Sequence, residues 1–520
     1  MMMNKISYES YMKRFSKAKS EKSNILETLK ECYRYALPSA NVDGYGSGSN
    51  TIDETPEVFD DTAKTALGKY ANRTQSQITP SWKTWAMLKA GTDIPKEERE
   101  EIDTKLEEVT EVIFDHIHHS NFLSAAHESF KDLGISTGAL LVEAGDGINS
   151  SLTFRAIPMM ELIPERSTDG KIKTVWREFR LEAIRIADMY PKANLNTDIS
   201  QAIKDNPNSE IDLVEGVVYD FKTRLYNHIL LHPASADTLL DEKIESSPYI
   251  VFRESTIAGQ AFGDGRIMNI ISTILKLNNL SYYEDVSVGL NAAGIYTVRD
   301  DGVISPDNIR VEPFGIIPVM SNETSNKSIS PLEMGTNFNV TDIKIKELQG
   351  EVRDVMQSQS FGNIEETPVR TAYEMSVREN DRMQTMHGAY GRLQTELLEP
   401  LLARIVYVLS EAGKIPPLRV NGREITIKFT SPAARVQDSE ELLALQEFMM
   451  YMENVPPEIT SAKFKLEEIP DFVAQRTGLP ASMMRNKAEE EQAVQGMQGA
   501  AIKGQQIMTD ATVPNVAAPQ

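Results

Sequence analysis

Apolar residues in the centre of the chain recur at the spacing of an α-helix. One such set after position 265 comprises Ile267, Ile270, Ile271, Ile274 and Leu277. On the opposite face, Lys276 is the only charge between Ile267 and Tyr283. A helix that is apolar on one side and almost uncharged on the other is rarely a solvated surface helix. We therefore expect a helix over 267–288 that packs on both sides, including against neighbouring copies of the chain.

A second amphipathic helix is predicted at 340–358. Its apolar stripe consists of Ile345, Leu348, Val352 and Val355, and its polar stripe of Lys346, Gln349, Arg353 and Gln357. A loop at 361–370 follows, and then a helical pattern over 371–412 that would span about 60 Å at ~1.5 Å per residue. Pro400 should kink or divide this long helix, because proline removes a backbone hydrogen bond.

The first half of the chain predicts helices and then strands. Helical patterns cover 4–37, 57–79, 95–118, 121–133 and, among the strands, 181–190. Short β-prone runs lie at 139–143, 152–157, 173–179, 214–221, 227–231 and 249–253. Two short strands, at 294–298 and 316–320, are expected between the central helices, and further strands at 418–420 and 425–429. Helices are expected at 437–453 and 463–475. The sequence thus predicts an α+β chain, mostly α, with a small and mostly antiparallel sheet or barrel.

Composition narrows the function classes. The chain has 520 residues and a formal net charge of -22, which opposes tight general binding to nucleic acid or to an anionic membrane. A single cysteine, Cys32, excludes an internal disulfide framework. No run approaches 18 apolar residues and the first residues carry no apolar core of a signal peptide, so we expect neither a membrane span nor a leader.

Three sequence patterns suggest chemistry, and each has a structural alternative. Residues Gly134-Ile135-Ser136-Thr137-Gly138 match a nucleophile elbow, but a helix precedes Ser136 and a strand follows it, the reverse of the required order. The alternative is a helix end with tight backbone packing. The histidines at 116, 118, 119 and 127 lack the HExxH pattern of a zinc site. We expect no metal, no cofactor and no enzymatic activity.

Two other sets of residues invite structural interpretations. Gly263 and Gly265 suit a sharp start to the helix at 267 better than a phosphate loop, since no GxGxxG or GxxxxGK[ST] is present. Trp82 and Trp85 are expected to be core anchors. Lys346 and Arg353 form either a solvated face or a sparse basic surface that contacts DNA in a pore.

Five short motifs occur in an order and spacing typical of one family. They are Val58-Phe59-Asp60-Asp61-Thr62-Ala63, Trp82 to Leu88, Asp132-Leu133-Gly134 through Gly138-Ala139-Leu140, Phe262-Gly263-Asp264-Gly265-Arg266 and Thr371-Ala372-Tyr373-Glu374. The chain resembles the portal (head-to-tail connector) proteins of short-tailed, T7-like bacteriophages (podoviruses) over most of residues 5–430. Asp264 departs from the family's Y-G-R-G pattern, and the match at Trp85 is loose.

The resemblance implies a subunit of a ring oligomer built from wing, stem, clip and crown parts. Its implied segments are a wing at 1–265, stem helices at 266–289 and 336–360, a clip at 290–335, a tunnel loop at 361–370, a long kinked helix returning to the wing at 371–430, crown helices at 431–487 and a disordered tail at 488–520. The tunnel surface would include Lys346, Arg353, Gly362, Asn363 and Arg370, with Gly263, Gly265 and Pro400 as caps and hinges.

The implied function is a ring of about twelve identical subunits at one capsid vertex of the virion. Double-stranded DNA would pass through it during packaging and ejection. Expected partners are the large terminase subunit, the major capsid and scaffolding proteins and the tail proteins, with assembly in the host cytoplasm and no membrane. Two alternatives stay open: a static capsid or scaffold component that never meets DNA, and a serine hydrolase that uses Ser136.

Overall fold

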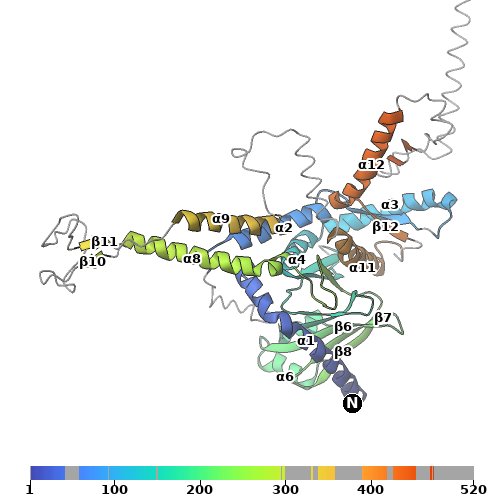
Figure 1. The fold of residues 1–520 in the computed structure, drawn as a ribbon. Coiled ribbons are helices and arrows are strands. Elements are labelled where there is room, and N and C mark those ends of the chain that lie inside the picture. Colours follow the sequence, from blue (N-terminus) through green and yellow to red (C-terminus); the bar gives the residue numbers. More distant parts are fainter. Residues whose placement is uncertain are drawn as a thin grey trace, which may run out of the picture. The chain divides into compact units, whose positions relative to one another are not determined.

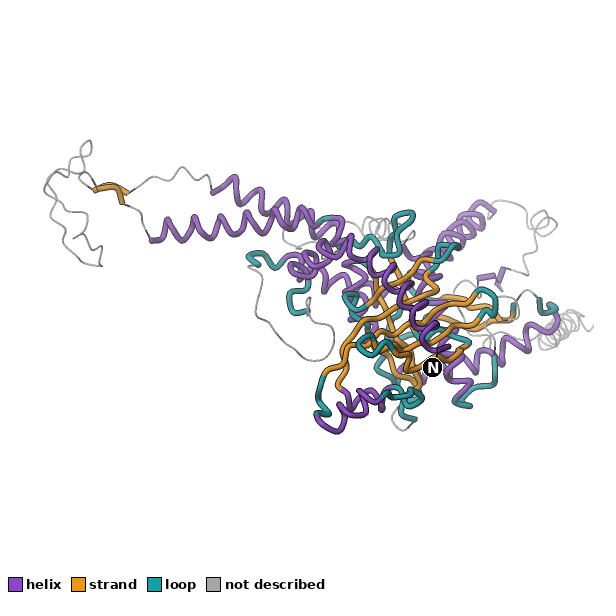
Figure 2. Tube along the Cα trace, turned by 90° about the horizontal axis from the view of Figure 1, so that it is seen from below, coloured by secondary structure: helices purple, strands orange, loops and turns teal. Residues whose placement is uncertain are grey.

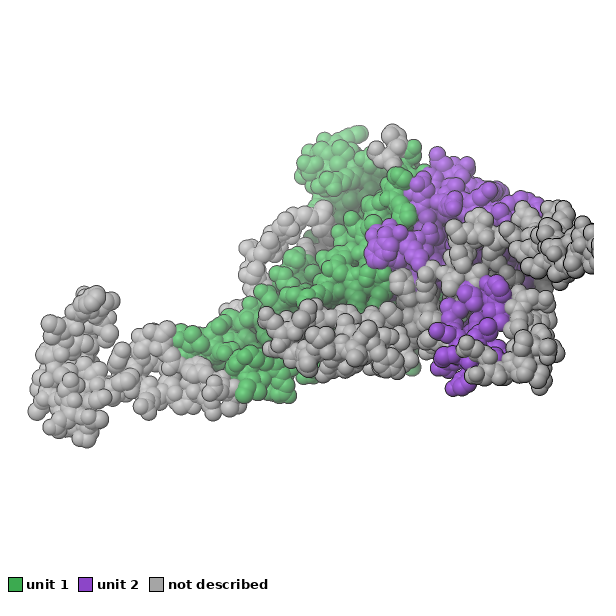
Figure 3. Space-filling model, turned by 90° about the horizontal axis from the view of Figure 1, so that it is seen from above, with its two compact units in different colours: residues 1–77, 117–408 green, residues 78–116, 409–520 purple. Residues whose placement is uncertain are grey.

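The computed structural model describes residues 2–40, 58–91, 93–147, 150–293, 296–298, 329–331, 338–357, 389–418, 425–452, 469–470 and 472–473. Contacts between residues divide the chain into two compact units. One unit comprises 1–77 and 117–408, and the other comprises 78–116 and 409–520 (Figure 3). The smaller unit is thus assembled from two segments far apart in the sequence.

The described residues of the larger unit form three antiparallel β-sheets, with two, three and five strands (Figures 1 and 2). The three-stranded sheet has the order β3 (Leu152–Ala156), β2 (Thr137–Ala144), β9 (Tyr249–Arg253). The five-stranded sheet runs β4 (Leu162–Arg166), β5 (Ile172–Glu182), β6 (Glu210–Asp220), β7 (Leu225–His232), β8 (Asp237–Ile244). All six strands predicted in this region are confirmed. The sequence prediction missed β4 and β8, and the strands form two sheets rather than one sheet or barrel.

Helices flank these sheets. They are α1 (Met2–Ala36), α2 (Thr62–Ile78), α4 (Phe122–Ile135), α5 (Ala183–Met189) and α6 (Thr197–Asp205), of which only α6 was not predicted. The helix α4 packs on the three-stranded sheet, where Phe130 meets Phe252 of β9 edge-on at 6.1 Å and Phe122 meets Phe154 of β3 at 5.1 Å. The helix α1 lies against the five-stranded sheet, where Phe15 packs on the buried Trp176.

The central helices differ from the prediction in their limits. A short turn α7 (Arg266–Asn269) ends at Ile270, and α8 (Ile271–Ala293) follows, so the expected single helix is interrupted at its start and continues five residues further. The second helix, α9 (Phe338–Val355), is confirmed. Between them, β10 (Tyr296–Val298) pairs with β11 (Ile329–Pro331). The strand expected at 316–320 lies outside the described residues.

Pro400 does not end the helix in which it lies, but a π-helical turn divides the α-helical run just before it. The chain is helical from residue 389, changes to a π-helical turn η2 (Gln394–Leu398), and continues as α11 (Glu399–Glu411). Pro400 is thus the second residue of α11. Wider π-type turns tolerate a missing N–H donor, and they often occur at functional positions. The part of this helix expected at 371–388 lies outside the described residues.

The smaller unit is built around a two-stranded sheet of β1 (Ala86–Ala90) and β12 (Ile425–Phe429), with helices α3 (Lys96–His118) and α12 (Pro432–Met452). Trp85 is buried as predicted and packs on Phe114 at 5.1 Å. The prediction for Trp82 was wrong, because its side chain is 72% exposed. The strand at 418–420, most of the helix at 463–475 and the tail from 488 fall outside the described residues. Among the described helices, none has both the length and the apolar character needed to cross a membrane.

Candidate functional site

The helices α8 and α9 lie side by side and share one hydrophobic core (Figure 2). Ile274 and Leu277 of α8 meet Ile345, Leu348 and Val352 of α9, and all five side chains are buried. The same cluster includes buried residues from α1 and α2, so the helix pair packs against other helices of the larger unit. Burying each such side chain contributes about 1.5–3 kcal/mol, which makes the pair a firm structural element.

The face of α8 that points away from this core is exposed and almost uncharged. We call it the α8 stripe, and it consists of Ser272, Lys276, Asn279, Tyr283 and Val286, spaced by three or four residues. Tyr283 is 63% exposed and Val286 is 39% exposed. Close by in the sequence, Val288 of α8 is also 53% exposed, and Ile343 on α9 is 65% exposed. Exposed large apolar side chains such as Tyr283 and Val286, one turn apart on the α8 stripe, indicate an interaction surface.

A segment before α2 covers part of the helix pair. The ring of Phe59 packs on Tyr282 at 4.8 Å, and the Phe59 N–H donates a 2.7 Å hydrogen bond to Asn278. The amide of Gln349 donates to Asp60 at 2.8 Å. Gln349, a member of the predicted polar stripe of α9, is therefore bound within its own subunit.

The two cations of the predicted polar stripe of α9, Lys346 and Arg353, have polar neighbours on their own helix. Lys346 donates to Asp342 one turn earlier at 2.7 Å, and this hydrogen bond raises the pKa of Lys346. Arg353 lies 3.4 Å from the amide oxygen of Gln349. Both cations are exposed, so they can contact a polyanion, but the carboxylate of Asp342 offsets part of the attraction.

The other predicted tunnel residues, Gly362, Asn363 and Arg370, lie outside the described residues. Gly263 and Gly265 are described, and both are tightly enclosed. A Cβ atom on Gly263 would lie 2.2 Å from the carbonyl oxygen of Ser136, and one on Gly265 would lie 2.0 Å from that of Ile135. Gly265 is the N-cap residue of α7. The reason for glycine here is close approach of two backbones, since neither position has a positive φ.

Ser136 does not have the surroundings of a nucleophile. It follows α4 and precedes β2, it is fully buried, and its hydroxyl donates a 2.7 Å hydrogen bond to the Gly263 carbonyl. A nucleophile elbow needs an exposed hydroxyl beside a general base. The arrangement of Ser136 is that of a buried structural contact, and it gives the hydrolase alternative no support.

The histidines do not converge on a metal site. Within the ranges that the structure describes, no group of three or more histidine, cysteine, aspartate or glutamate side chains is placed to hold a metal ion. His127 sits partly buried on α4, and its burial lowers the pKa of the imidazole.

A buried polar cluster in the five-stranded sheet was missed at the sequence level. Glu215 of β6 accepts hydrogen bonds from Tyr190 at 2.9 Å, from Tyr249 at 2.5 Å and from His228 at 2.8 Å. Burial alone would raise its pKa, but the bond and charge of His228 and the charge of Arg177 outweigh it and lower the pKa to about 2. A glutamate flanked in the strand by Leu213 and Val214 on one side and Val217 and Val218 on the other was the available signal.

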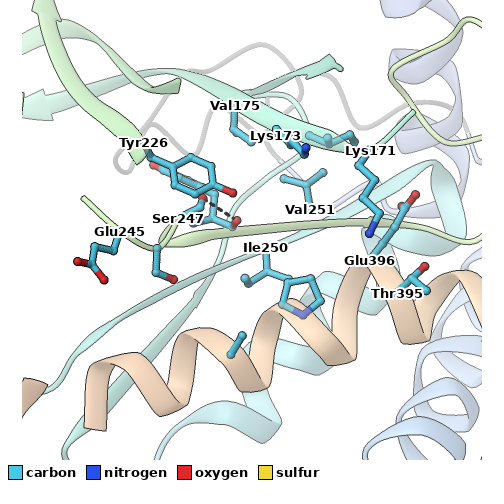
Figure 4. A pocket seen from close by; sticks show the side chains of 15 residues that line it. Lys171, Lys173, Val175, Tyr226, Glu245, Ser247, Ile250, Val251, Thr395 and Glu396 are labelled. Carbon is cyan, nitrogen blue, oxygen red and sulfur yellow. Dashed lines mark hydrogen bonds between the residues drawn. The ribbon is translucent and has the colours of Figure 1, made fainter. Parts of the chain in front are cut away.

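A pocket of about 270 Å³ lies between β5, β9 and the η2–α11 helix (Figure 4). Lys171, Lys173 and Glu396 are among its polar lining residues. The amine of Lys173 is held by Asp169 at 2.6 Å, and the Glu396 carboxylate is held by Arg253 at 2.6 Å. Because the charges of Lys173 and Glu396 are paired within the protein, these two side chains are already engaged and do not point to a bound ligand.

Comparison with known proteins agrees with a structural role. A family model described as bacteriophage head to tail connecting protein matches residues 9–484. A protein of Bordetella phage BPP-1 named probable portal protein is 18% identical over 520 residues, which cover 93% of this chain and 92% of that protein. Since the family model spans nearly the whole sequence, this chain belongs to the bacteriophage head-to-tail connecting protein family.

Proposed function

We propose that this chain is a portal subunit of a T7-like, short-tailed phage, and that about twelve copies close into a ring at one capsid vertex. Double-stranded DNA passes through the ring during packaging and ejection. The large terminase subunit docks on the ring first, and the tail docks later. The family role, which is structural and joins head to tail, places the chain in the virion with capsid and tail partners.

The observation that carries the proposal is the α8 stripe. A closed ring is held by heterologous contacts, in which one face of a subunit meets a different face of the next copy. The stripe presents Tyr283 and Val286 to solvent with Lys276 as its one charge. Burying such a face against a neighbour removes apolar area from water and strips few charges of their hydration.

DNA passage requires weak contacts rather than a tight grip. DNA carries one charge per ~1.7 Å, and a protein that neutralised many phosphates would hold it in place. A chain with a net charge of -22 repels DNA in general. In this proposal the sparse cations Lys346 and Arg353 contact phosphates transiently, because Asp342 offsets part of their attraction.

In the proposed portal ring, the remaining segments have the following roles. The wing is 1–265, the stem helices lie within 266–289 and 336–360, and the clip at 290–335 is where terminase and then tail bind. The tunnel loop is 361–370 and the crown is 431–487. Major capsid and scaffolding proteins contact the outside of the ring during assembly.

Negative-stain electron microscopy of the purified full-length chain tests the ring directly. End-on views should show a ring with a central hole, and native mass spectrometry should give one discrete oligomer. A sample that stays monomeric both alone and with capsid and scaffolding proteins contradicts the proposal.

Packaging assays then separate a conduit from a static component. Substitutions at Gly362, Asn363 and Arg370 should reduce DNA packaging or retention in heads that still incorporate the ring. Unchanged packaging and retention would favour a static capsid component.

A further inference from the structure

Two adjacent residues of opposite charge at the end of β9 bind two different helical elements. Arg253, the last residue of β9, forms a two-point ion pair with Glu396 in η2, with distances of 2.6 Å and 3.0 Å. A further guanidinium nitrogen donates to the Ala261 carbonyl at 3.0 Å. Arg253 is 2% exposed, so water does not weaken this pair. The helix that contains η2 is thereby bound to β9.

The next residue, Glu254, binds Arg266, and Arg266 in turn binds the end of α9. Its carboxylate accepts from Arg266 Nε at 2.8 Å and from the Tyr70 hydroxyl at 2.7 Å. Arg266 also donates to the carbonyl of Val355, the last residue of α9, at 2.9 Å. A cation at a helix C-terminus satisfies carbonyls that lack partners and opposes the negative end of the helix dipole.

Two further arginines extend these contacts on either side. Arg73 of α2 donates to the carbonyl of Gln357 at 3.0 Å, just beyond α9. Arg392 donates to the Thr256 hydroxyl, three residues after Arg253. Residues 253–256 therefore contact the chain immediately after position 388, and through Arg266 they also contact it immediately before position 358.

We propose that Arg253 and Glu254 form a common anchor that sets the spacing of the two ends of segment 358–388. Arg253 is held in the sheet beside β2 and Glu254 follows it directly, so α9 and η2 are both positioned relative to the same strand. The inference rests on the proposed function in one respect, since it makes these two residues positioning residues for the loop at 361–370. The anchor itself depends only on contacts within one subunit.

A matched control is available in the same unit. Arg177 and Glu161 form a second buried ion pair, at 2.8 Å, with side chains that are each 9% exposed. This pair joins β5 to the turn before β4 and involves neither α9 nor η2. A purely structural role predicts that Glu396→Gln, Glu254→Gln and Glu161→Gln lower thermal stability alike and change nothing else.

Distances between spin labels test the anchor in the full-length protein. Labels on Glu351→Cys and Thr395→Cys, both at exposed positions, report the separation of α9 and η2. The native Cys32 is fully buried and its pKa is raised to about 12 by burial, so it should not take the label. Diluting labelled with unlabelled subunits isolates distances within one subunit.

We expect a single narrow distance distribution in the parent protein and in Glu161→Gln. Glu396→Gln and Glu254→Gln should broaden or shift it at temperatures where all variants remain folded. Tyr70→Phe, which removes one hydroxyl from Glu254, is the milder variant if the glutamine variants fail to fold. An unchanged distribution in the folded anchor variants would overturn the proposal.

Packaging efficiency distinguishes the anchor from the proposed role of the loop at 361–370. Reduced packaging by anchor variants that still form rings supports both the anchor and the conduit. A changed distance with normal packaging supports the anchor and counts against the proposed role of the loop.

Discussion

The hydroxyl of Ser136 donates a 2.7 Å hydrogen bond to the carbonyl oxygen of Gly263, across 127 positions of sequence. The Gly263 N–H in turn donates to the Thr137 hydroxyl at 2.8 Å. Two sequence motifs that suggested separate chemistries, a nucleophile elbow and a phosphate loop, therefore form one buried joint. The joint connects the end of α4 to the start of α7, where the α8–α9 pair begins.

The close backbone contact at this joint predicts that alanine substitutions at Gly265 and Gly350 change the stability in opposite directions. Gly265→Ala places a methyl group against the Ile135 carbonyl and should lower the free energy of unfolding by about 1–3 kcal/mol or more, as overpacking does. Gly350→Ala on α9 meets nothing within 4 Å and should raise it by about 0.5–1 kcal/mol. Urea denaturation of both variants measures the difference. Equal effects of the two substitutions would show that the close backbone approach is not a constraint.

The α8 stripe predicts an assembly defect without a folding defect. Tyr283→Asp and Val286→Asp place a charge on a face that the ring would bury, and removing an unpaired charge from water is costly. Analytical ultracentrifugation should show a shift toward monomer with an unchanged circular dichroism spectrum. Ile257→Asp, at a position that is 50% exposed and belongs to neither α8 nor α9, serves as the control. If the stripe variants assemble as well as the control does, the stripe is not the contact between subunits.

The exposed cations of α9 predict a defect that appears only when DNA is present. The double variant Lys346→Ala and Arg353→Ala should leave ring formation intact and reduce packaging or retention of DNA, most clearly at low salt, where screening is weakest. Lys344→Ala, which removes a cation paired with Glu347 at 2.9 Å on the same helix, is the matched control. The same loss in both variants would point to net charge rather than to position.

The cluster around Glu215 predicts a maximum of stability in mildly acidic solution. Burial would lower the pKa of His228, but its bond to Glu215 outweighs burial and raises it above the ordinary 6.5, so its contribution is complete below pH 6.5 and is lost as the pH rises through the folded value. The pKa of Glu215 is lowered from 4.5 to about 2, so its contribution is complete above pH 4.5 and is lost as the pH falls toward 2. Together they favour the folded state most between pH 4.5 and 6.5.

Thermal melts of the parent protein and of His228→Gln across pH 3–9 check this behaviour. Glutamine can still donate to Glu215 but does not ionise. The difference in melting temperature between the two proteins should therefore be largest near pH 5–6 and shrink above pH 7. A difference that does not vary with pH would mean that folding leaves the pKa of His228 unshifted.

The sequence by itself determined the elements with strong local periodicity. The apolar stripe of Ile345, Leu348 and Val352 predicted α9 and its buried face correctly, because a helix repeats its faces every 3.6 residues whatever surrounds it. The strands with apolar runs were also predicted, because their signal too lies within a short segment. By contrast β8, with Asp237, Asp241 and Glu242 among its residues, carries little apolar signal and was missed.

Only the tertiary structure decided which distant residues meet. Nothing local to Arg253 or Glu396 shows that they form a pair, since 143 positions separate them and the contact exists only after β9 and η2 pack together. Trp82 and Trp85 have the same side chain and opposite exposures, because burial depends on what the rest of the fold brings to each position. Periodicity is a property of a short segment, whereas charge pairing and burial are properties of the packed chain.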